Sequence, residues 1–99
     1  MKVIIVMNAH DNVGNAVEDI SKGDEVAYEV EGVRHTFTAV GDVPFGFKVA
    51  VKPIEAGGDI TKYKEVIGRA AVAIQAGECV HIHNVEGKRG RGDIAGGKA

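Results

Sequence analysis

Cys79, His81 and His83 are the residues best suited to chemistry, because they alternate along one short segment. Alternate side chains of a β-strand point to the same face, so this spacing predicts that all three share one face. Val80 and Ile82 would then point to the core. Two imidazoles on one strand face can reach one metal ion or one substrate, and imidazole titrates near neutral pH. The spacing leaves an alternative open, which is an exposed strand face with two solvated histidines.

Lysine and amide side chains form a second candidate group. Lys48 follows a Phe-Gly-Phe run, and Lys62 and Tyr63 lie between two expected turns. An ammonium group at a strand end can bind a carboxylate or a phosphate, although most such lysines are solvated surface residues. The His-Asp-Asn run at 10–12 is interpreted first as a helix cap and second as a ligand cluster.

Several functional classes are excluded. The chain has no P-loop, no dinucleotide fingerprint, no Cys-x-x-Cys pair and a single serine, so covalent serine catalysis is not expected. A net charge of −2 argues against a dedicated nucleic-acid binder. One cysteine cannot form an intramolecular disulfide, and the apolar run at 3–7 is too short for a membrane span or signal peptide. We therefore expect a soluble cytoplasmic protein without a nucleic-acid or membrane partner.

The elements that must position these residues begin with an apolar strand over 2–7, which we expect to be buried. Asp11 or Asn12 could cap a short helix. The apolar residues that follow are spaced as on one helical face. They are Val13, Ala16, Val17 and Ile20.

The rest of the pattern predicts strands. Residues 25–31 alternate, Glu31-Gly32 is typical of a turn, and 34–40 returns as the second arm of a hairpin. Further short strands are expected at 47–52, 66–70 and 79–84. The sequence therefore predicts a mainly β fold, a small barrel-like sheet with one short helix.

One pattern recurs along the chain: an isoleucine, two residues, a glycine, two residues, then a valine or isoleucine. It occurs at 20–26, 54–60 and 74–80, and 43–49 fits it loosely as a fourth copy. The unequal spacing excludes a regular solenoid. We expect each first residue to anchor in the core, each glycine to adopt a positive φ, and each last residue to begin a strand.

The end of the chain differs in composition. Residues 86–99 are rich in glycine and basic residues, and Ile94 is their only large aliphatic residue. Such a segment cannot pack a core. We expect one folded domain over 1–85 and a flexible Gly/Arg-rich tail over 86–99.

The combined motifs resemble the small subunit of altronate dehydratase. They are also similar to the N-terminal part of galactarate and altronate dehydratases and to the small subunit of sulfolactate sulfo-lyase. The matching segments are 10–13, 44–50, Ile54, Gly57, Lys62-Tyr63, 67–70, Ile74, Gly77, 81–84 and 89–93. The resemblance implies a SAF-type domain with a β-clip fold. It also implies a lyase that removes water from a polyhydroxy carboxylate to give a 2-keto-3-deoxy acid.

The same resemblance implies site roles. His81 and His83 would act as the base or as metal ligands, and Lys48 and Lys62 would hold the substrate carboxylate. Hydroxyl groups of the substrate would be bound by polar residues, namely Tyr63, Asn84 and Asn12. A divalent metal such as iron would be shared with, or held by, a large catalytic subunit. A homo-oligomer is a further expectation.

Two positions depart from the family pattern. Phe47 stands where the family usually has histidine, and Lys64 stands where it usually has glycine. Because phenylalanine can neither titrate nor coordinate a metal, the substrate could differ, or the site could rely more on the partner subunit. Two alternatives to a sugar-acid dehydratase subunit stay open. They are a sulfolactate sulfo-lyase-type subunit and a non-catalytic module that binds a sugar acid or docks to a partner.

Overall fold

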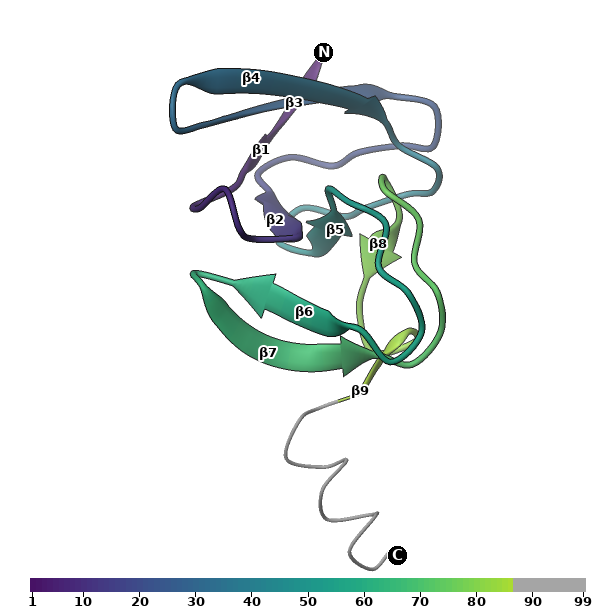
Figure 1. Ribbon diagram of the computed structural model, residues 1–99. Helices are drawn as coiled ribbons and strands as arrows, with labels where there is room; N and C mark the ends of the chain where they lie inside the picture. The colour runs from purple at the N-terminus through teal and green to yellow at the C-terminus, as the bar shows by residue number, and fades with distance from the viewer. Residues whose placement is uncertain (87–99) are drawn as a thin grey trace, which may run out of the picture.

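The computed structural model describes residues 1–86, in which nine short strands form two sheets and no helix is present (Figure 1). The mainly β expectation is confirmed, and the β-clip designation stays a prediction. The strands are β1 (Lys2–Ile5), β2 (Val13–Ala16), β3 (Glu25–Val30), β4 (Val33–Thr38), β5 (Lys48–Ala50), β6 (Asp59–Lys62), β7 (Glu65–Ala70), β8 (Cys79–Val80) and β9 (Val85–Glu86). No helix in this part could span a membrane. Apart from Glu86, the expected tail lies outside the described residues.

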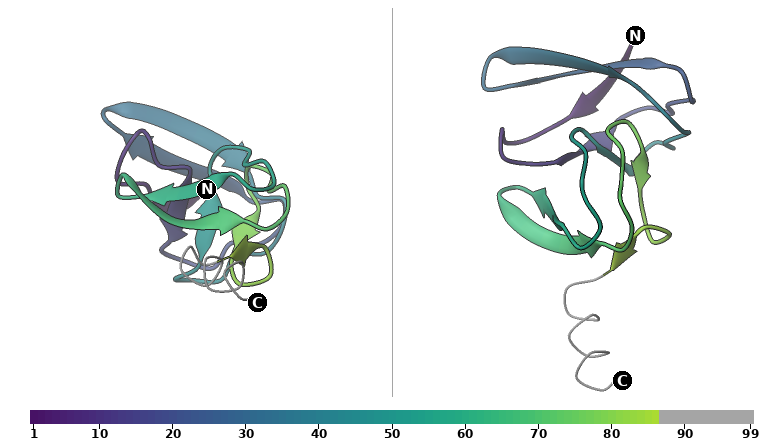
Figure 2. Two further views of the ribbon diagram at one scale, coloured as in Figure 1. Left: turned by 60° about the horizontal axis from the view of Figure 1, so that its bottom comes forward. Right: turned by 45° about the vertical axis from the view of Figure 1, so that its right-hand side comes forward.

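The larger sheet has the order β4-β3-β1-β2-β5-β8, and the smaller has the order β6-β7-β9. Only β1 and β3 pair in parallel among these strands. The β3–β4 hairpin lies at one end of the molecule and the β6–β7 hairpin at the other, with β2 and β5 between them (Figures 1 and 2). Lys48 and His81 lie where β5 and β8 meet the smaller sheet.

The prediction of a helix after Asn12 is wrong. Residues Val13–Ala16 form β2, which pairs with β1 on one edge and β5 on the other. These two ladders satisfy the backbone groups that a helix would have satisfied internally. A Cβ built on Gly14 would lie 2.7 Å from Cγ2 of Val6, so β1 and β2 approach very closely here. Tertiary pairing has overridden the helical spacing of the apolar residues.

Strand β1 also differs from its expectation, because it is buried on one face only. Ile4 and Val6 are buried, whereas Val3, Ile5 and Met7 are exposed. The alternation follows the period of two in a strand with one face on the core. The β3–β4 hairpin is confirmed by its continuous antiparallel register.

The repeated unit is confirmed in all four copies, including the loose one. Each anchor is buried, each glycine has a φ between 84° and 92°, and each last residue is buried. The anchors are Ile20, Val43, Ile54 and Ile74, the glycines are Gly23, Gly46, Gly57 and Gly77, and the last residues are Val26, Val49, Ile60 and Val80. A left-handed turn of this kind costs a glycine little, which explains its recurrence.

The copies pair reciprocally through a further residue that the sequence pattern did not single out, an alanine four positions before each anchor. Each glycine N–H donates to the alanine carbonyl of the paired copy at 2.8 Å. The four bonds run from Gly23 to Ala39, Gly46 to Ala16, Gly57 to Ala70 and Gly77 to Ala50. The anchors of paired copies also bridge, Ile20 with Val43 and Ile54 with Ile74. Each pair supplies much of one of the two apolar cores.

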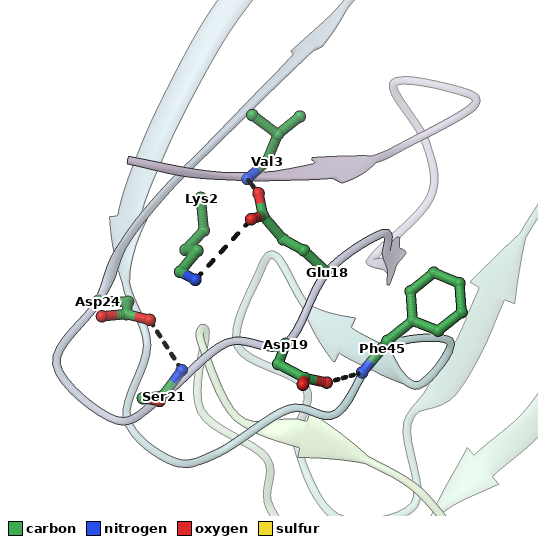
Figure 3. A network of polar contacts seen from close by, with 7 residues as sticks. All are labelled: Lys2, Val3, Glu18, Asp19, Ser21, Asp24 and Phe45. Atoms are coloured by element: carbon green, nitrogen blue, oxygen red, sulfur yellow. Dashed lines mark hydrogen bonds and ion pairs between the residues drawn. The ribbon is translucent and has the colours of Figure 1, made fainter.

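Carboxylates close the loops of the first pair (Figure 3). Asp24 accepts a hydrogen bond from the Ser21 N–H at 2.8 Å, and Asp19 accepts one from the Phe45 N–H at 2.8 Å. Glu18 accepts from the Val3 N–H at 3.1 Å, with its other oxygen 3.8 Å from Nζ of Lys2. Asp24 and Asp19 thus supply acceptors for loop N–H groups, and Glu18 supplies one for an N–H group of β1.

Candidate functional site

A hollow of about 360 Å³ lies where β5 and β8 meet the smaller sheet. Its polar side chains are Lys48 and His81. Its other lining residues are aliphatic, namely Ile60, Ile67, Val80, Ile82 and Val85. An apolar hollow with a few convergent polar groups is the usual form of a small-molecule site.

The two histidines do not share a strand face, because β8 ends at Val80 and residues 81–84 form a turn. Val80 is buried as expected, but Ile82 is 83% exposed, so its predicted core position is wrong. His81 lines the hollow with Lys48, whereas His83 borders a different depression beside Cys79. The prediction that His81 and His83 share one strand face is therefore wrong, because the strand ends before both residues.

Asn84 shapes this turn and is only 1% exposed. Its Oδ1 accepts a hydrogen bond from the His81 N–H at 3.0 Å, and its Nδ2 donates to the Cys79 carbonyl at 2.9 Å. The Asn84 N–H donates to the His81 carbonyl at 3.0 Å. The Asn84 amide thus holds the backbone of His81 in place. Its predicted contact with substrate hydroxyls stays a prediction.

His81 packs against Phe47, the residue that stands where histidine was expected. Their ring centroids lie 4.3 Å apart and the planes are inclined by 39°. Phe47 itself is half-buried and packs against the apolar core that contains the anchors Ile20 and Val43, which we call the first core. Position 47, where the family usually has histidine, therefore adjoins the histidine of the hollow.

Lys48 begins β5, an inner strand of the larger sheet that lies next to the edge strand β8. It pairs with Asn15 of β2 on one side and with Val80 of β8 on the other. Directly paired residues of antiparallel strands project from the same face. Within residues 1–86 the Lys48 ammonium forms no ion pair. It is therefore a cation available to an anionic ligand.

Lys62 and Tyr63 lie apart from the hollow, at the tip of the β6–β7 hairpin. Nζ of Lys62 is 4.9 Å from the centroid of the Tyr63 ring, a cation–π contact. Tyr63 and Lys64 both adopt left-handed backbone angles, with φ of 55° and 66°. The structure does not bring these residues to Lys48 and His81, since none of them lines that hollow.

Asp11 and Asn12 bind this hairpin instead of capping a helix. The Asp11 carboxylate accepts hydrogen bonds from the N–H groups of Tyr63 at 2.9 Å and Lys64 at 3.0 Å. Oδ1 of Asn12 accepts from the Thr61 N–H, and its Nδ2 donates to the Asp59 carbonyl, both at 2.8 Å. Asn12 therefore links the segment just before β2 to β6. Its role toward substrate stays a prediction.

Cys79 is half-buried beside the Glu78 carboxylate. Burial, and to a lesser extent the neighbouring Glu78 carboxylate, raise the pKa of the Cys79 thiol. The thiol is therefore protonated at neutral pH. Among residues 1–86, no group of three or more His, Cys, Asp or Glu side chains could hold a metal ion.

Asn15 is a residue of this region that sequence analysis missed. It neighbours Lys48 across the strands, and its Oδ1 is buried without a hydrogen-bond partner. The available signal was a polar side chain within the otherwise apolar segment 13–17. Because a helix was expected over this segment, the position of Asn15 on a sheet face was not predicted.

These features define a small β domain with an apolar hollow and a free ammonium group at the junction of its two sheets. The chain belongs to the altronate/galactarate dehydratase SAF domain family, whose model matches residues 2–88. The family resemblance stated from the sequence is thereby confirmed.

Curated relatives fall into two kinds. Altronate dehydratase of Bacillus subtilis is 36% identical over 87 residues, which cover 87% of this chain but 16% of the relative. The (2R)-sulfolactate sulfo-lyase subunit alpha of Chromohalobacter salexigens is 34% identical over 88 residues, covering 86% of this chain and 94% of the relative. The (2R)-sulfolactate sulfo-lyase subunit alpha of Paracoccus pantotrophus is 44% identical over 52 residues, which cover 52% of this chain and 78% of the relative. The chain thus spans a small part of the dehydratase and most of each sulfo-lyase subunit.

Proposed function

We propose that this chain is the small subunit of a two-component sugar-acid dehydratase, which assists the removal of water from a polyhydroxy carboxylate. The observation that carries the proposal is the unpaired ammonium of Lys48 beside His81 in an apolar hollow. Support also comes from dehydratase relatives that match over most of this chain but extend far beyond it. The remaining catalytic groups would come from a large subunit.

The chemistry assigns separate roles to the two polar residues of the hollow. Lys48 pairs with the substrate carboxylate and fixes its position. A base removes the proton from the carbon next to that carboxylate, and hydroxide leaves from the neighbouring carbon with a proton, as water. The resulting enol becomes a 2-keto-3-deoxy acid. His81 is the group of the hollow that can take or return a proton, because an imidazole nitrogen can accept or donate one.

A divalent metal is not assigned to this chain. His81 and His83 line different depressions, and the described residues contain no cluster suited to a metal ion. The metal implied by the resemblance therefore does not fit these residues alone, and we place its ligands in the large subunit. His83 stays a proposed base. The proposed substrate contacts besides Lys48 stay Lys62, Tyr63, Asn84 and Asn12.

The second candidate is the small subunit of a sulfo-lyase. It is favoured by the extent to which this chain covers two subunits alpha of (2R)-sulfolactate sulfo-lyase, 94% and 78% of their lengths. Sulfolactate and altronate are both 2-hydroxy carboxylates, so Lys48 would hold the carboxylate in either case. The two candidates differ in the leaving group.

The test is turnover by this chain co-expressed with its large subunit. Altronate and (2R)-sulfolactate are supplied separately, and 2-keto acid and sulfite are measured. We expect 2-keto acid from altronate with the complex and none with the 99-residue chain alone. Sulfite release from sulfolactate would select the second candidate. Full turnover by the isolated chain would contradict a two-subunit enzyme.

A matched pair of lysine variants tests the site itself. Lys48→Met should raise the KM of the complex for the acid, because the carboxylate loses its ion pair. Lys22→Met changes an exposed lysine that does not line the hollow and should leave KM unchanged. Equal effects of the two variants would show that Lys48 does not bind substrate.

A further inference from the structure

One face of the larger sheet carries a continuous cross-strand row. Ile5 pairs with Asn15, Asn15 with Lys48, and Lys48 with Val80. Paired side chains on one face have Cβ atoms about 4.5–5.5 Å apart. Asn15 is therefore the next side chain in the row after the two that line the hollow, Lys48 and Val80.

The amide of Asn15 is unusual for a buried polar group. Its Oδ1 is the only buried side-chain nitrogen or oxygen without a partner within residues 1–86. Most such atoms in proteins are hydrogen-bonded, so an exception calls for an explanation. Asn12, nearby in the same segment, shows the ordinary case, since both atoms of its amide are bonded to β6. Nothing in the fold of residues 1–86 uses the Asn15 amide in this way.

We propose that Asn15 is a substrate-binding residue that recognises a hydroxyl group next to the carboxylate held by Lys48. This inference rests on the proposed function and assigns the residue of this chain that distinguishes a hydroxycarboxylate from a simple carboxylate. The spacing of Lys48 and Asn15 suits a carboxylate and a hydroxyl on adjacent or nearby carbons. Asn15 is half-buried, and the terminal torsion of asparagine is broad. Rotation about that bond exchanges the positions of Oδ1 and Nδ2, so Oδ1 can turn from its buried position toward a hydroxyl bound beside Lys48.

The binding test uses the full 99-residue chain and two acids of equal length, altronate and hexanoate. Each is titrated into wild type, Asn15→Val and Lys48→Met, and the shift of the backbone amide resonance of residue 48 is followed by NMR. We expect Asn15→Val to weaken altronate binding by about 5-fold, the loss of one hydrogen bond. Hexanoate, which has no hydroxyl, should bind equally to both proteins.

A stability measurement separates this role from a structural one. Replacing an amide that bonds nothing in the free protein by a β-branched side chain should raise Tm, by about 4 °C or more. The matched control is Asn12→Val, which removes two hydrogen bonds to β6 and should lower Tm. A lower Tm for Asn15→Val would overturn the inference, because the amide would then be bonded within the protein.

The outcomes also separate this inference from the proposed function. If Lys48→Met abolishes binding of both acids while Asn15→Val affects neither, the inference fails and the proposed anion site stands. If neither acid shifts the Lys48 resonance of the wild type, the proposed anion site fails, and the inference fails with it. A selective loss of altronate binding in Asn15→Val, with a raised Tm, supports both.

Discussion

Phe47 and His81 pack ring against ring, with centroids 4.3 Å apart. One follows the turn at Gly46 and the other follows β8, so two copies of the repeated unit bring them together. The contact joins the half-buried Phe47, which packs on the first core, to the one histidine that lines the hollow. A change of the side chain at position 47 therefore changes a residue in direct contact with the His81 ring.

Phe47→His should create a pair of imidazoles that can bind one metal ion. We expect the variant to bind Zn²⁺ by calorimetry more tightly than the wild type. It should also lose about 1–3 kcal/mol of unfolding free energy, because a polar ring replaces an apolar one against the core. Phe45→His is the control, since Phe45 is 67% exposed and should cost little when replaced. Equal zinc binding by the two variants would show that the contact with His81 is irrelevant to coordination.

Asp11→Ala should destabilise the β6–β7 hairpin. The buried carboxylate accepts hydrogen bonds from Tyr63 and Lys64, and its loss leaves both N–H groups without an acceptor. We expect a loss of about 2–4 kcal/mol in unfolding free energy, measured with urea. Asp19→Ala, which removes one exposed hydrogen bond to Phe45, should cost clearly less. A similar cost for both would mean that burial adds nothing to the Asp11 interaction.

Lys64→Gly should stabilise the protein. Lys64 has a φ of 66°, a left-handed angle that glycine adopts more readily than lysine. We expect a gain of about 1 kcal/mol in thermal or urea unfolding. Lys62→Gly is the opposite case, because Lys62 lies in β6, where glycine costs about 0.5–1 kcal/mol. A loss of stability in Lys64→Gly would show that the Lys64 side chain makes a contribution larger than its strain.

Cys79 should react slowly with iodoacetamide at pH 8. Its pKa is raised above the ordinary 9.0 by burial and then by Glu78, so little thiolate is present at that pH. The rate should rise with pH and reach half its maximum above pH 9. Glu78→Gln removes the negative charge and should move that midpoint downward. A midpoint below pH 9 in the wild type would contradict the burial argument.

The sequence by itself determined the features that depend on neighbouring residues. The β3–β4 hairpin follows from alternation and from a Glu-Gly turn, with φ of 53° and 79°. The repeated unit follows from an apolar anchor and a glycine that tolerates a positive φ. The family resemblance depends on such motifs together, and the matching family model confirms it.

Only the tertiary structure decided which strands pair and where each one ends. The apolar spacing after Asn12 suits a helix, but β1 and β5 flank this segment and make it a strand. His81 and His83 alternate in sequence, yet Asn84 folds them into a turn whose side chains reach different depressions. Asn15 faces Lys48 through a ladder between residues far apart in the chain. Such long-range pairing depends on the whole core, so no local spacing could reveal the neighbours of these side chains.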